Sequence, residues 1–585
     1  MGNVKQDLFV ARDPEFTWED EESLARCKSK YNGARALLDM LEKEGVELIF
    51  GYPGGVLLTL YDALLDSSIK HILPRHEQSA VHAADAYARV SGKVGVCLAT
   101  SGPGAANMVT GIANAYMDSV PLVVLTGQVP THLLGTDSFQ EVDITGMTLP
   151  ITKHSYLVKD ANDIPRIVRE AFYLASTGRP GPVLIDLPKD VMAAEVTSSC
   201  PEKVHLPSYK YFSKGNAGQI IEAAKAISMS KKPVVYAGGG VITSAAGLSL
   251  CQLIEKLNIP VVTTLMGIGS IPSTHPNLLG MVGMHGTVTA NLAVNDCDLL
   301  IAVGVRFDDR VTSGLKHRFA TKAKVIHIDI DPAEIGKVVR ANIPIVGDAR
   351  LVLEDLLPKV QVPETSAWWN QLRAWQQEYP LRYEQNGHLN PQMILEALGR
   401  IGGEQAVVTT DVGQHQMWAA QFYPVKVPRH FITSAGLGTM GFGFPAAIGA
   451  QFAKPDSLVF LVTGDGSFQM SIQELATTVQ YSLPIKIILM NNGVLGMVRQ
   501  LQKMFYNERF NQIQLHANPN FVKVAEAYGV KGLRVDKPEE VEAALIKAID
   551  YPGPFLLDFA ISPDEVVLPM VPSGKVITEV LGGED

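Results

Sequence analysis

Two short motifs place oxygen-bearing side chains at the ends of two apolar runs. Gly464-Asp465-Gly466 ends one run, and Asn491-Asn492 ends another after an interval of 24 residues. Such runs predict buried strands, and parallel strands bring their carboxyl ends to one edge of a sheet, where ligands bind. Mg²⁺ prefers hard oxygen ligands and shares its shell with phosphates. The candidate ligands of a metal that holds a diphosphate are Asp465, Asn492 and the backbone carbonyl of Val494.

The segment between the motifs fits a strand–helix–strand unit. Ser471-Ile472-Gln473-Glu474 has the pattern of a capping box and predicts a helix that starts at Ser471. Glycines around Asp465 allow the backbone to approach phosphates closely. The alternative is an ordinary crossover with a glycine turn. Because both motifs follow apolar strands at this distance, the combination favours function, and it resembles the pattern of thiamine diphosphate (ThDP) enzymes.

ThDP also needs a carboxylic acid that hydrogen-bonds its aminopyrimidine ring and favours the reactive imino tautomer. Glu77 is the candidate, because it lies where a strand at 69–73 meets a helix of small residues at 79–86. Burial in a cleft there would raise the pKa of the carboxyl and favour proton sharing. The alternative is an acidic residue that only interacts with the dipole at the start of a helix.

Composition indicates an intracellular globular protein, which agrees with an enzyme of this kind. The chain has 585 residues, 46% of them hydrophobic and 19% charged, which predicts roughly three domains. The formal net charge of −10 argues against nucleic-acid binding. The cysteines Cys27, Cys97, Cys200, Cys251 and Cys297 lack the spacing of a zinc site or a disulfide framework. No apolar stretch reaches about 18 residues, which predicts no membrane span, and the polar N-terminus does not resemble a signal peptide. We therefore expect a cytoplasmic protein.

Alternating strands and helices predict an α/β protein with three doubly wound parallel sheets. The expected divisions are a polar N-terminal extension at 1–27, domains at 28–195, 217–358 and 380–560, and a C-terminal tail at 561–585. Expected strands are 47–50, 69–73, 94–99, 122–126 and 183–187, then 234–237, 261–264, 299–303 and 325–330, then 406–409, 431–434, 458–463, 485–490 and 555–559. The first and third domains share a rhythm that is consistent with duplication, and a polar stretch from Thr197 to Asn216 predicts a linker.

The middle domain lacks the GxGxxG fingerprint of dinucleotide-binding folds. Its Gly238-Gly239-Gly240 turn is only suggestive, whereas the segment from Arg306 to Arg310, directly after a strand, suits an anionic ligand. A surface ion-pair cluster is the alternative for that segment. Asp329, near the end of another strand, is a candidate for a ribose hydroxyl.

Together these motifs resemble the catalytic subunits of the acetohydroxyacid synthase (acetolactate synthase) family over nearly all of residues 30–565. The resemblance rests on several segments in a fixed order. They are Gly51-Tyr52-Pro53-Gly54-Gly55, Arg75-His76-Glu77, Thr100-Ser101-Gly102-Pro103-Gly104, Gly127-Gln128-Val129-Pro130, Phe139-Gln140-Glu141, Gly178-Arg179-Pro180-Gly181-Pro182, Gly283-Met284-His285-Gly286, Arg306-Phe307-Asp308-Asp309-Arg310, Gly413-Gln414-His415-Gln416-Met417-Trp418, Gly436-Leu437-Gly438-Thr439-Met440-Gly441 and the two motifs above.

The resemblance implies a pyrimidine-binding first domain, a middle domain associated with FAD and a third domain that binds the diphosphate and Mg²⁺. It implies that Glu77 activates ThDP and that Asp465, Asn492 and Val494 hold the metal. The residues implied to line ThDP are Gly413, Gln414, His415, Met440, Gly466, Ser467 and Met497. The implied contacts of FAD, which takes no part in net redox chemistry in this family, are Arg179, Met284, His285, Gly304, Arg306, Asp308, Asp329 and Asp348.

The implied reaction decarboxylates pyruvate on ThDP and joins the two-carbon unit to a second 2-oxo acid, pyruvate or 2-oxobutyrate. The products, 2-acetolactate or 2-aceto-2-hydroxybutyrate, begin branched-chain amino acid biosynthesis. In this family the active site forms between two subunits, which implies a homodimer or a dimer of dimers. A small regulatory subunit is the usual partner.

The resemblance also implies substrate-side residues. Arg310 is the candidate for the carboxylate of the second substrate, Gly55 leaves space over the thiazolium, and Phe139, Gln140 and Lys153 shape the entrance. Two residues depart from the family. Leu501 stands where most anabolic members have Trp, which predicts a weaker preference for 2-oxobutyrate and poor binding of herbicides that stack there. Val56 replaces the usual Ala and narrows the pocket slightly.

Three other functions stay open at this point. A pyruvate oxidase that uses ThDP and FAD shares the fold but passes electrons to the flavin. A catabolic acetolactate synthase lacks bound FAD, which the segment from Arg306 to Arg310 argues against. A non-catalytic nucleotide-binding or regulatory protein would have no use for both Glu77 and the metal pair.

Overall fold

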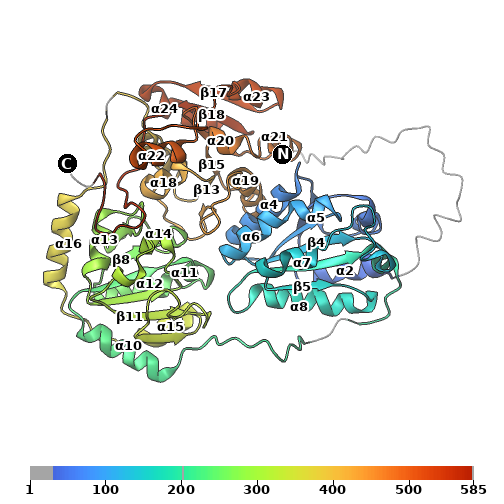
Figure 1. Cartoon of the computed structure of the whole chain (residues 1–585), viewed down its shortest axis with the longest axis horizontal. Helices are drawn as coiled ribbons and strands as arrows, with labels where there is room; N and C mark the ends of the chain where they lie inside the picture. The colour runs from blue at the N-terminus through green and yellow to red at the C-terminus, as the bar shows by residue number, and fades with distance from the viewer. Residues whose placement is uncertain (1–30, 200–202, 386, 583–585) are drawn as a thin grey trace, which may run out of the picture.

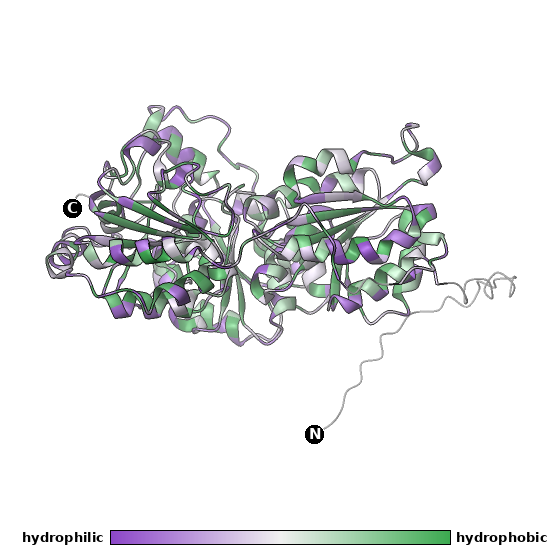
Figure 2. Ribbon diagram, turned by 90° about the horizontal axis from the view of Figure 1, so that it is seen from below, coloured by the Kyte–Doolittle hydropathy of each residue, from purple (hydrophilic) through white to green (hydrophobic). Residues whose placement is uncertain are grey.

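The structure is a computed structural model that describes residues 31–199, 203–385 and 387–582. Its strands form three sheets of six, and all strand pairs within them are parallel, as predicted for an α/β protein of this class (Figure 1). The strands are mostly apolar, whereas the helices that cover them carry both polar and apolar residues (Figure 2). Among the described residues, no helix has the length and apolar character needed to cross a bilayer.

The first sheet has the strand order β2-β1-β3-β4-β6-β5. Its strands are β1 (Leu48–Tyr52), β2 (Lys70–Ile72), β3 (Gly95–Ala99), β4 (Leu122–Gln128), β5 (His154–Leu157) and β6 (Pro182–Pro188). The accompanying helices are α2 (Gly33–Lys43), α3 (Leu58–Leu64), α4 (Glu77–Ser91), α5 (Pro103–Asn107), α6 (Val109–Met117), α7 (Ile144–Thr148), α8 (Ile164–Ser176) and α9 (Lys189–Ala193). The stretch 203–216 that follows has no helix or strand, in line with the predicted linker.

The middle sheet has the order β12-β11-β10-β7-β8-β9, which is the order of the dinucleotide-binding Rossmann fold. Its strands are β7 (Pro233–Ala237), β8 (Val261–Thr263), β9 (Leu278–Met281), β10 (Leu299–Val303), β11 (Lys324–Asp329) and β12 (Ile343–Val346). The helices are α10 (Ala217–Met229), α11 (Gly239–Thr243), α12 (Gly247–Leu257), α13 (Val288–Asp296), α14 (Asp309–Thr312), α15 (Ala349–Leu356) and α16 (Ser366–Glu378). The glycine turn at 238–240 starts α11.

The third sheet has the order β14-β13-β15-β16-β18-β17, which repeats the order of the first sheet. Its strands are β13 (Val407–Thr410), β14 (Phe431–Ile432), β15 (Val459–Gly464), β16 (Lys486–Asn491), β17 (Lys531–Val535) and β18 (Phe555–Ala560). The helices are α17 (Pro391–Gly402), α18 (Gln414–Phe422), α19 (Gly443–Ala453), α20 (Asp465–Phe468), α21 (Glu474–Gln480), α22 (Gly496–Phe505), α23 (Phe521–Ala527) and α24 (Val541–Asp550). The repeated order supports the expected duplicated architecture.

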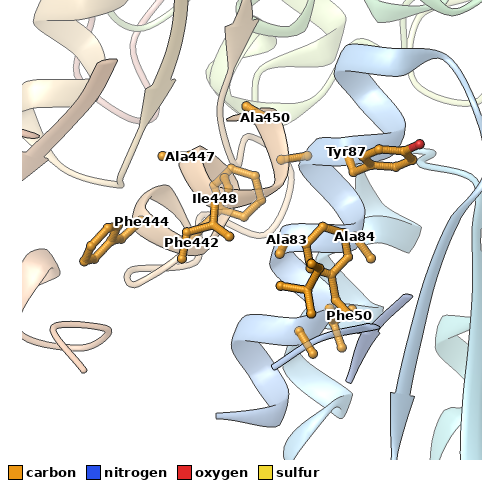
Figure 3. Packing of buried hydrophobic residues seen from close by; sticks show 14 of the residues in the cluster. Phe50, Ala83, Ala84, Tyr87, Phe442, Phe444, Ala447, Ile448 and Ala450 are labelled. Atoms are coloured by element: carbon orange, nitrogen blue, oxygen red, sulfur yellow. The ribbon is translucent and has the colours of Figure 1, made fainter. Parts of the chain in front are cut away.

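The first and third domains pack through α4 and α19 (Figure 3). Small residues of α4, among them Ala83 and Ala84, face Ala447 and Ile448 of α19 in one continuous apolar core. The contact is so close that a Cβ on Gly449 would lie 1.9 Å from the carbonyl oxygen of Ala83. The helix that begins with Glu77 is therefore fixed directly against the domain that carries Asp465.

The capping box predicted at Ser471 is wrong. Helix α21 begins at Glu474, its N-cap is Gln473, and no side chain caps it. The Glu474 carboxylate is buried and accepts the backbone N–H of Arg75 from the first domain, at 3.0 Å. Glu474 therefore forms a contact between the first and third domains and does not form the local helix cap that the sequence predicted.

Candidate active site

Asp465 lies at the carboxyl end of β15, beside β16, with Gly464 paired to Met490. Its side chain is buried and accepts a hydrogen bond from the Asn518 amide. Burial raises the pKa of this carboxyl, while the Asn518 amide and the N–H groups of Asn492 and Gly493 act in the opposite direction. The two sequence motifs thus meet at the sheet edge, as predicted, and leave a buried carboxylate that a cation would stabilise.

Asn492 and Val494 form the other side of this edge. The Asn492 side-chain oxygen accepts the Val494 N–H at 3.2 Å, and the Asn492 amide lies 3.4 Å from Oε1 of Gln414. Among the described residues, no group of three or more His, Cys, Asp or Glu side chains could hold a metal ion. A donor set with one carboxylate, one amide and one carbonyl suits Mg²⁺ that completes its shell with phosphate and water.

Gln414 and His415 open α18 at the same sheet edge. The Gln414 amide donates to the Gln500 side chain and to the Glu565 carbonyl, each at 2.9 Å. Burial lowers the pKa of His415 to about 3, so this imidazole is neutral at physiological pH. Its buried Nε2 has no hydrogen-bond partner in the described chain. A buried polar atom of this kind is one that a bound ligand would satisfy.

The remaining residues implied to line ThDP surround this edge. Gly413 has φ +150° and precedes α18, a backbone conformation that favours glycine. A Cβ on Gly466 would lie 2.9 Å from the Leu495 side chain and 3.9 Å from Met440 Cε. Ser467 donates to the carbonyl of Val412, next to Gly413, at 3.0 Å. Met497 on α22 packs against the core of this domain. The structure therefore groups Gly413, Gln414, His415, Met440, Gly466, Ser467, Asn492 and Val494 at the sheet edge that carries Asp465, and Met497 follows Gly496 at the start of α22.

Glu77 lies at the start of α4 in the first domain, after the N-cap His76. Its Oε2 accepts the Asn107 amide at 3.0 Å, and its Oε1 would lie 3.4 Å from a Cβ on Gly104. Two other expected residues lie around the same turn. Gln140 is one of them, because a Cβ on Gly102 would lie 2.8 Å from Gln140 Cα. Gly55 is the other, because its neighbour Gly54 packs against the Thr100 side chain. Nothing lies within 4 Å of a Cβ on Gly55, so the space there is open.

Gln140 is exposed and has φ +59°, a conformation that a non-glycine residue adopts only under local constraint. Phe139 beside it has 87% of its surface exposed. An exposed aromatic side chain next to a strained backbone is typical of a loop that meets a ligand or another chain.

The Lys153 side chain makes its hydrogen bonds with residues other than Glu77 and the turn at 100–104. Its ammonium donates to the carbonyls of Leu174 and Thr177, at the end of α8, and to the Tyr209 hydroxyl. Burial lowers the pKa of Lys153 to about 8. In this arrangement all three N–H groups stabilise a helix C-terminus and the linker, which is a structural role.

Arg310 lies in the middle domain with two residues of the implied FAD set. Its backbone carbonyl accepts the Met284 N–H at 2.8 Å, and its guanidinium contacts the Met284 sulfur at 3.8 Å. Burial, and to a smaller extent the nearby guanidinium of Arg310, lowers the pKa of His285 to about 4. The Arg310 side chain is 70% exposed and has only a long ion pair, 3.9 Å, with Asp309. It is thus available for an anionic ligand.

The other implied FAD residues divide into two groups. Asp308 and Asp348 are the N-caps of α14 and α15, and Asp329 accepts the Asp331 N–H at 2.9 Å. Burial raises the pKa of Asp329 to about 6. The second group spans domains: Arg179 bonds Ser119, Asp331 and Glu334, and Arg306 donates to the Met117 carbonyl.

Gly304, at φ +59°, packs against the glycine turn that starts α11. This contact brings the loops after β7 and β10 together at the point where the strand order reverses. Such a switch point is where Rossmann folds bind dinucleotides.

A cavity of about 390 Å³ lies where the first domain, the linker and the middle domain meet. Its lining includes Tyr116, Lys153, Arg179, Tyr209, Tyr211 and Asp331. The combination of cations with aromatic rings suits an aromatic ligand that carries negative charge.

Sequence reasoning missed several residues that hold the site. Asn107, Asn518 and Gln500 each bond a predicted functional side chain, but none lies in a recognisable local pattern. The sequence analysis named residues 561–585 only as a C-terminal tail and assigned them no contacts. In the structure Val567 exchanges hydrogen bonds with Gln500, and Val571 donates to the Met284 carbonyl, so the tail joins the third and middle domains.

Comparison with known proteins agrees with this geometry. Three family models match: the N-terminal TPP binding domain of thiamine pyrophosphate enzymes at residues 31–147, their central domain at 220–356 and their C-terminal TPP binding domain at 411–559. The chain is 52% identical over 562 residues to a probable acetolactate synthase large subunit of Methanocaldococcus jannaschii, covering 94% of this chain and 95% of the relative. It is 51% identical over 562 residues to an acetolactate synthase of Mycobacterium bovis, with 94% and 91% covered. It is 50% identical over 530 residues to the isozyme 3 large subunit of Escherichia coli, with 89% and 92% covered. This chain belongs to the thiamine pyrophosphate enzymes and, within them, to the family of the acetolactate synthase large subunits.

Proposed function

We propose that this chain is the catalytic subunit of an acetolactate synthase that uses ThDP, Mg²⁺ and FAD. The observation that carries the proposal is the meeting of Asp465, Asn492, Gln414 and His415 at one edge of the third sheet, with a buried carboxylate and an unpartnered imidazole nitrogen. The reaction joins the two-carbon unit of pyruvate to a second 2-oxo acid. It would form the first common step of branched-chain amino acid biosynthesis.

The third domain would hold the diphosphate through Mg²⁺. Asp465, the side-chain oxygen of Asn492 and the carbonyl of Val494 are the protein ligands. Gln414, through Gln500 and the Glu565 carbonyl, fixes the Asn492 amide and hence the orientation of its oxygen. The hard oxygen donors and the buried charge fit this ion. Gly413, Met440, Gly466, Ser467 and Met497 would contact the organic part of the cofactor.

When bound, ThDP supplies a carbanion that adds to a ketone and accepts the electron pair as CO₂ leaves. Glu77 would hold a proton at the aminopyrimidine ring, with Asn107 fixing one of its two carboxylate oxygens at 3.0 Å. The turn 100–104 and the open space at Gly55 leave room beside this acid.

We propose that the complete site forms between two copies of the chain. The support is that the described hydrogen bonds of Glu77 and of Asp465 stay within their own domains, to Asn107 and Asn518. A homodimer, or a dimer of dimers, would let Glu77 of one copy meet the metal edge of the other. A small regulatory subunit is a further proposed partner, because two of the compared relatives are named large subunits.

The exposed guanidinium of Arg310 would bind the carboxylate of the second substrate, because Asp309 holds it only weakly. Leu501 on α22, which is 36% exposed, offers a smaller wall than Trp for the side chain of that substrate. Gln140 and Phe139 would border the entrance. Lys153 would act on the entrance only indirectly, by holding α8 and the linker.

FAD would occupy the region between the 390 Å³ cavity and Arg310, with Arg179, Met284, His285, Gly304, Arg306, Asp308, Asp329 and Asp348 along it. The unpartnered Nδ1 of buried His285 and the Rossmann strand order fit a dinucleotide. A cytoplasmic location stays the prediction from the sequence.

The test is acetolactate formation from pyruvate by the purified full chain, with and without each of ThDP, Mg²⁺ and FAD. The proposal expects product that depends on ThDP and Mg²⁺, and release of one CO₂ for each acetolactate. Flavin bleaching by pyruvate at the rate of turnover would instead identify a pyruvate oxidase. Activity in a colourless, flavin-free protein would identify a catabolic synthase.

A further inference from the structure

The loop Thr433–Phe442, here called the Met440 loop, joins β14 to α19 and is held from outside its own domain. Asp118, at the end of α6 in the first domain, accepts the Ala435 N–H at 3.1 Å and the Gly436 N–H at 2.8 Å. One turn earlier on α6, Asn114 accepts the hydroxyl of Ser434 at 2.6 Å. Two first-domain side chains thus fix the start of the loop.

The two side chains are fixed in turn by a buried ionic network. Arg89 of α4 donates to Asp118 at 3.0 Å and to Asp85, and the Asn114 amide donates to Asp85 at 3.1 Å. The Arg89 guanidinium also donates to the Thr433 carbonyl at 2.9 Å. The side chains of both aspartates are fully buried. Buried charges of this kind add little net stability but impose one geometry on the groups they bind.

The third domain holds the other end of the same loop. Asp411, at the end of β13, accepts the N–H groups of Gly441 and Gly443 at 2.8 and 3.1 Å. Met440 lies between these anchors, and its Cε would lie 3.9 Å from a Cβ on Gly466. The position of Met440 above the metal edge therefore depends on both domains.

We propose that Asp118 and Asn114 are positioning residues that set the Met440 loop for ThDP. The inference rests on the proposed function, since it assumes that Met440 contacts the cofactor. In this proposal the first domain has two separate roles. Through Asp118 and Asn114 it positions the cofactor pocket of its own chain, and through Glu77 on α4 it supplies the acid to the pocket of the other copy.

The experiment compares two variants by ThDP binding and turnover. Asp118→Asn keeps the shape of the side chain but can accept only one of the two loop N–H groups. Ser434→Ala removes the hydroxyl that bonds Asn114 and accepts the Thr439 N–H at 2.8 Å, without changing any charge. Calorimetry on the Mg²⁺-loaded dialysed protein measures the Kd of ThDP, and pyruvate turnover at saturating ThDP measures kcat.

We expect the Kd of ThDP to rise by roughly tenfold or more in Asp118→Asn, the effect of losing one charge-assisted hydrogen bond, and by a smaller factor in Ser434→Ala. The control is Glu170→Gln, which disrupts the ion pair of another buried carboxylate in the same domain, whose partner Arg166 is partly exposed. This control should lower the unfolding temperature but leave the Kd unchanged.

Unchanged ThDP affinity in both loop variants, with a wild-type protein that binds ThDP, would overturn the inference and leave the proposed function intact. A wild-type protein that binds no ThDP would instead overturn the proposed function. If Asp118→Asn does not fold, Ser434→Ala decides alone, because it leaves the ionic network whole.

Discussion

Replacing Glu77 by glutamine removes the proposed proton donor while the shape of the side chain stays the same. In the wild type the Asn107 amide donates to Oε2 of Glu77 at 3.0 Å, and the amide oxygen of the glutamine can still accept this hydrogen bond. We therefore expect the free energy of unfolding to change by less than about 1 kcal/mol, since no hydrogen bond is lost. Positioned acid–base groups contribute about 10²- to 10⁴-fold to rate. We thus expect kcat to fall by that factor, or roughly 3–5 kcal/mol in activation free energy.

The assay is the initial rate of acetolactate formation at saturating pyruvate, ThDP and Mg²⁺, together with thermal unfolding of the same samples. Glu47→Gln is the matched control, because Glu47 is an exposed carboxylate of the same domain whose partner is Lys93. The control should keep the wild-type rate. A Glu77→Gln protein that is folded and turns over within about threefold of wild type would show that the carboxyl has no role in proton transfer.

Three further outcomes test other parts of the structure. Asp465→Asn should raise the Mg²⁺ concentration for half-maximal activity by at least about tenfold, because it removes the anionic ligand, and an unchanged Mg²⁺ titration would exclude this metal site. Burial raises the pKa of Asp186 in the folded protein from 3.8 to about 7, so ionisation of this carboxyl lowers the stability of the fold as pH rises through this interval. The unfolding temperature of Asp186→Asn, relative to that of wild type, should therefore be higher at pH 8 than at pH 5. An equal difference at the two pH values would contradict the shift. Leu501→Trp should increase the preference for 2-oxobutyrate over pyruvate in a competition assay, and no change would show that this position does not contact the second substrate.

The central strands of all three sheets and the edge strands β2 and β14 could be predicted from the sequence, but the other four edge strands could not. Every strand that the apolar runs missed lies at an edge: β5, β9, β12 and β17. Their burial is partial, with exposed or half-buried residues at half or more of the positions in each strand. An edge strand has one paired side and often one covered face, so it lacks the continuous apolar run that marks a central strand.

In the site, too, residues that follow a local sequence pattern could be predicted, whereas residues that act through contacts distant in sequence could not. Motifs that end apolar strands correctly placed Asp465 beside Asn492, because strand pairing follows from local pattern. The partners that orient them, such as Asn518 and Gln500, come from surface loops and helices with no pattern of their own. The local rule also failed at Glu474, where a contact with Arg75 from another domain replaced the expected cap. Tertiary contacts of this kind leave no periodic trace.

The absence of a side chain at Gly449 has a consequence for how this sequence can vary. Since its Cα hydrogen is all that separates α19 from the Ala83 carbonyl, even one methyl group there would push two helices apart. One helix starts at Glu77 and the other follows Met440, so a single enlargement would displace the elements that one chain contributes to two different pockets. Tolerance to mutation should therefore be low at Gly449, a position outside the proposed ligand contacts.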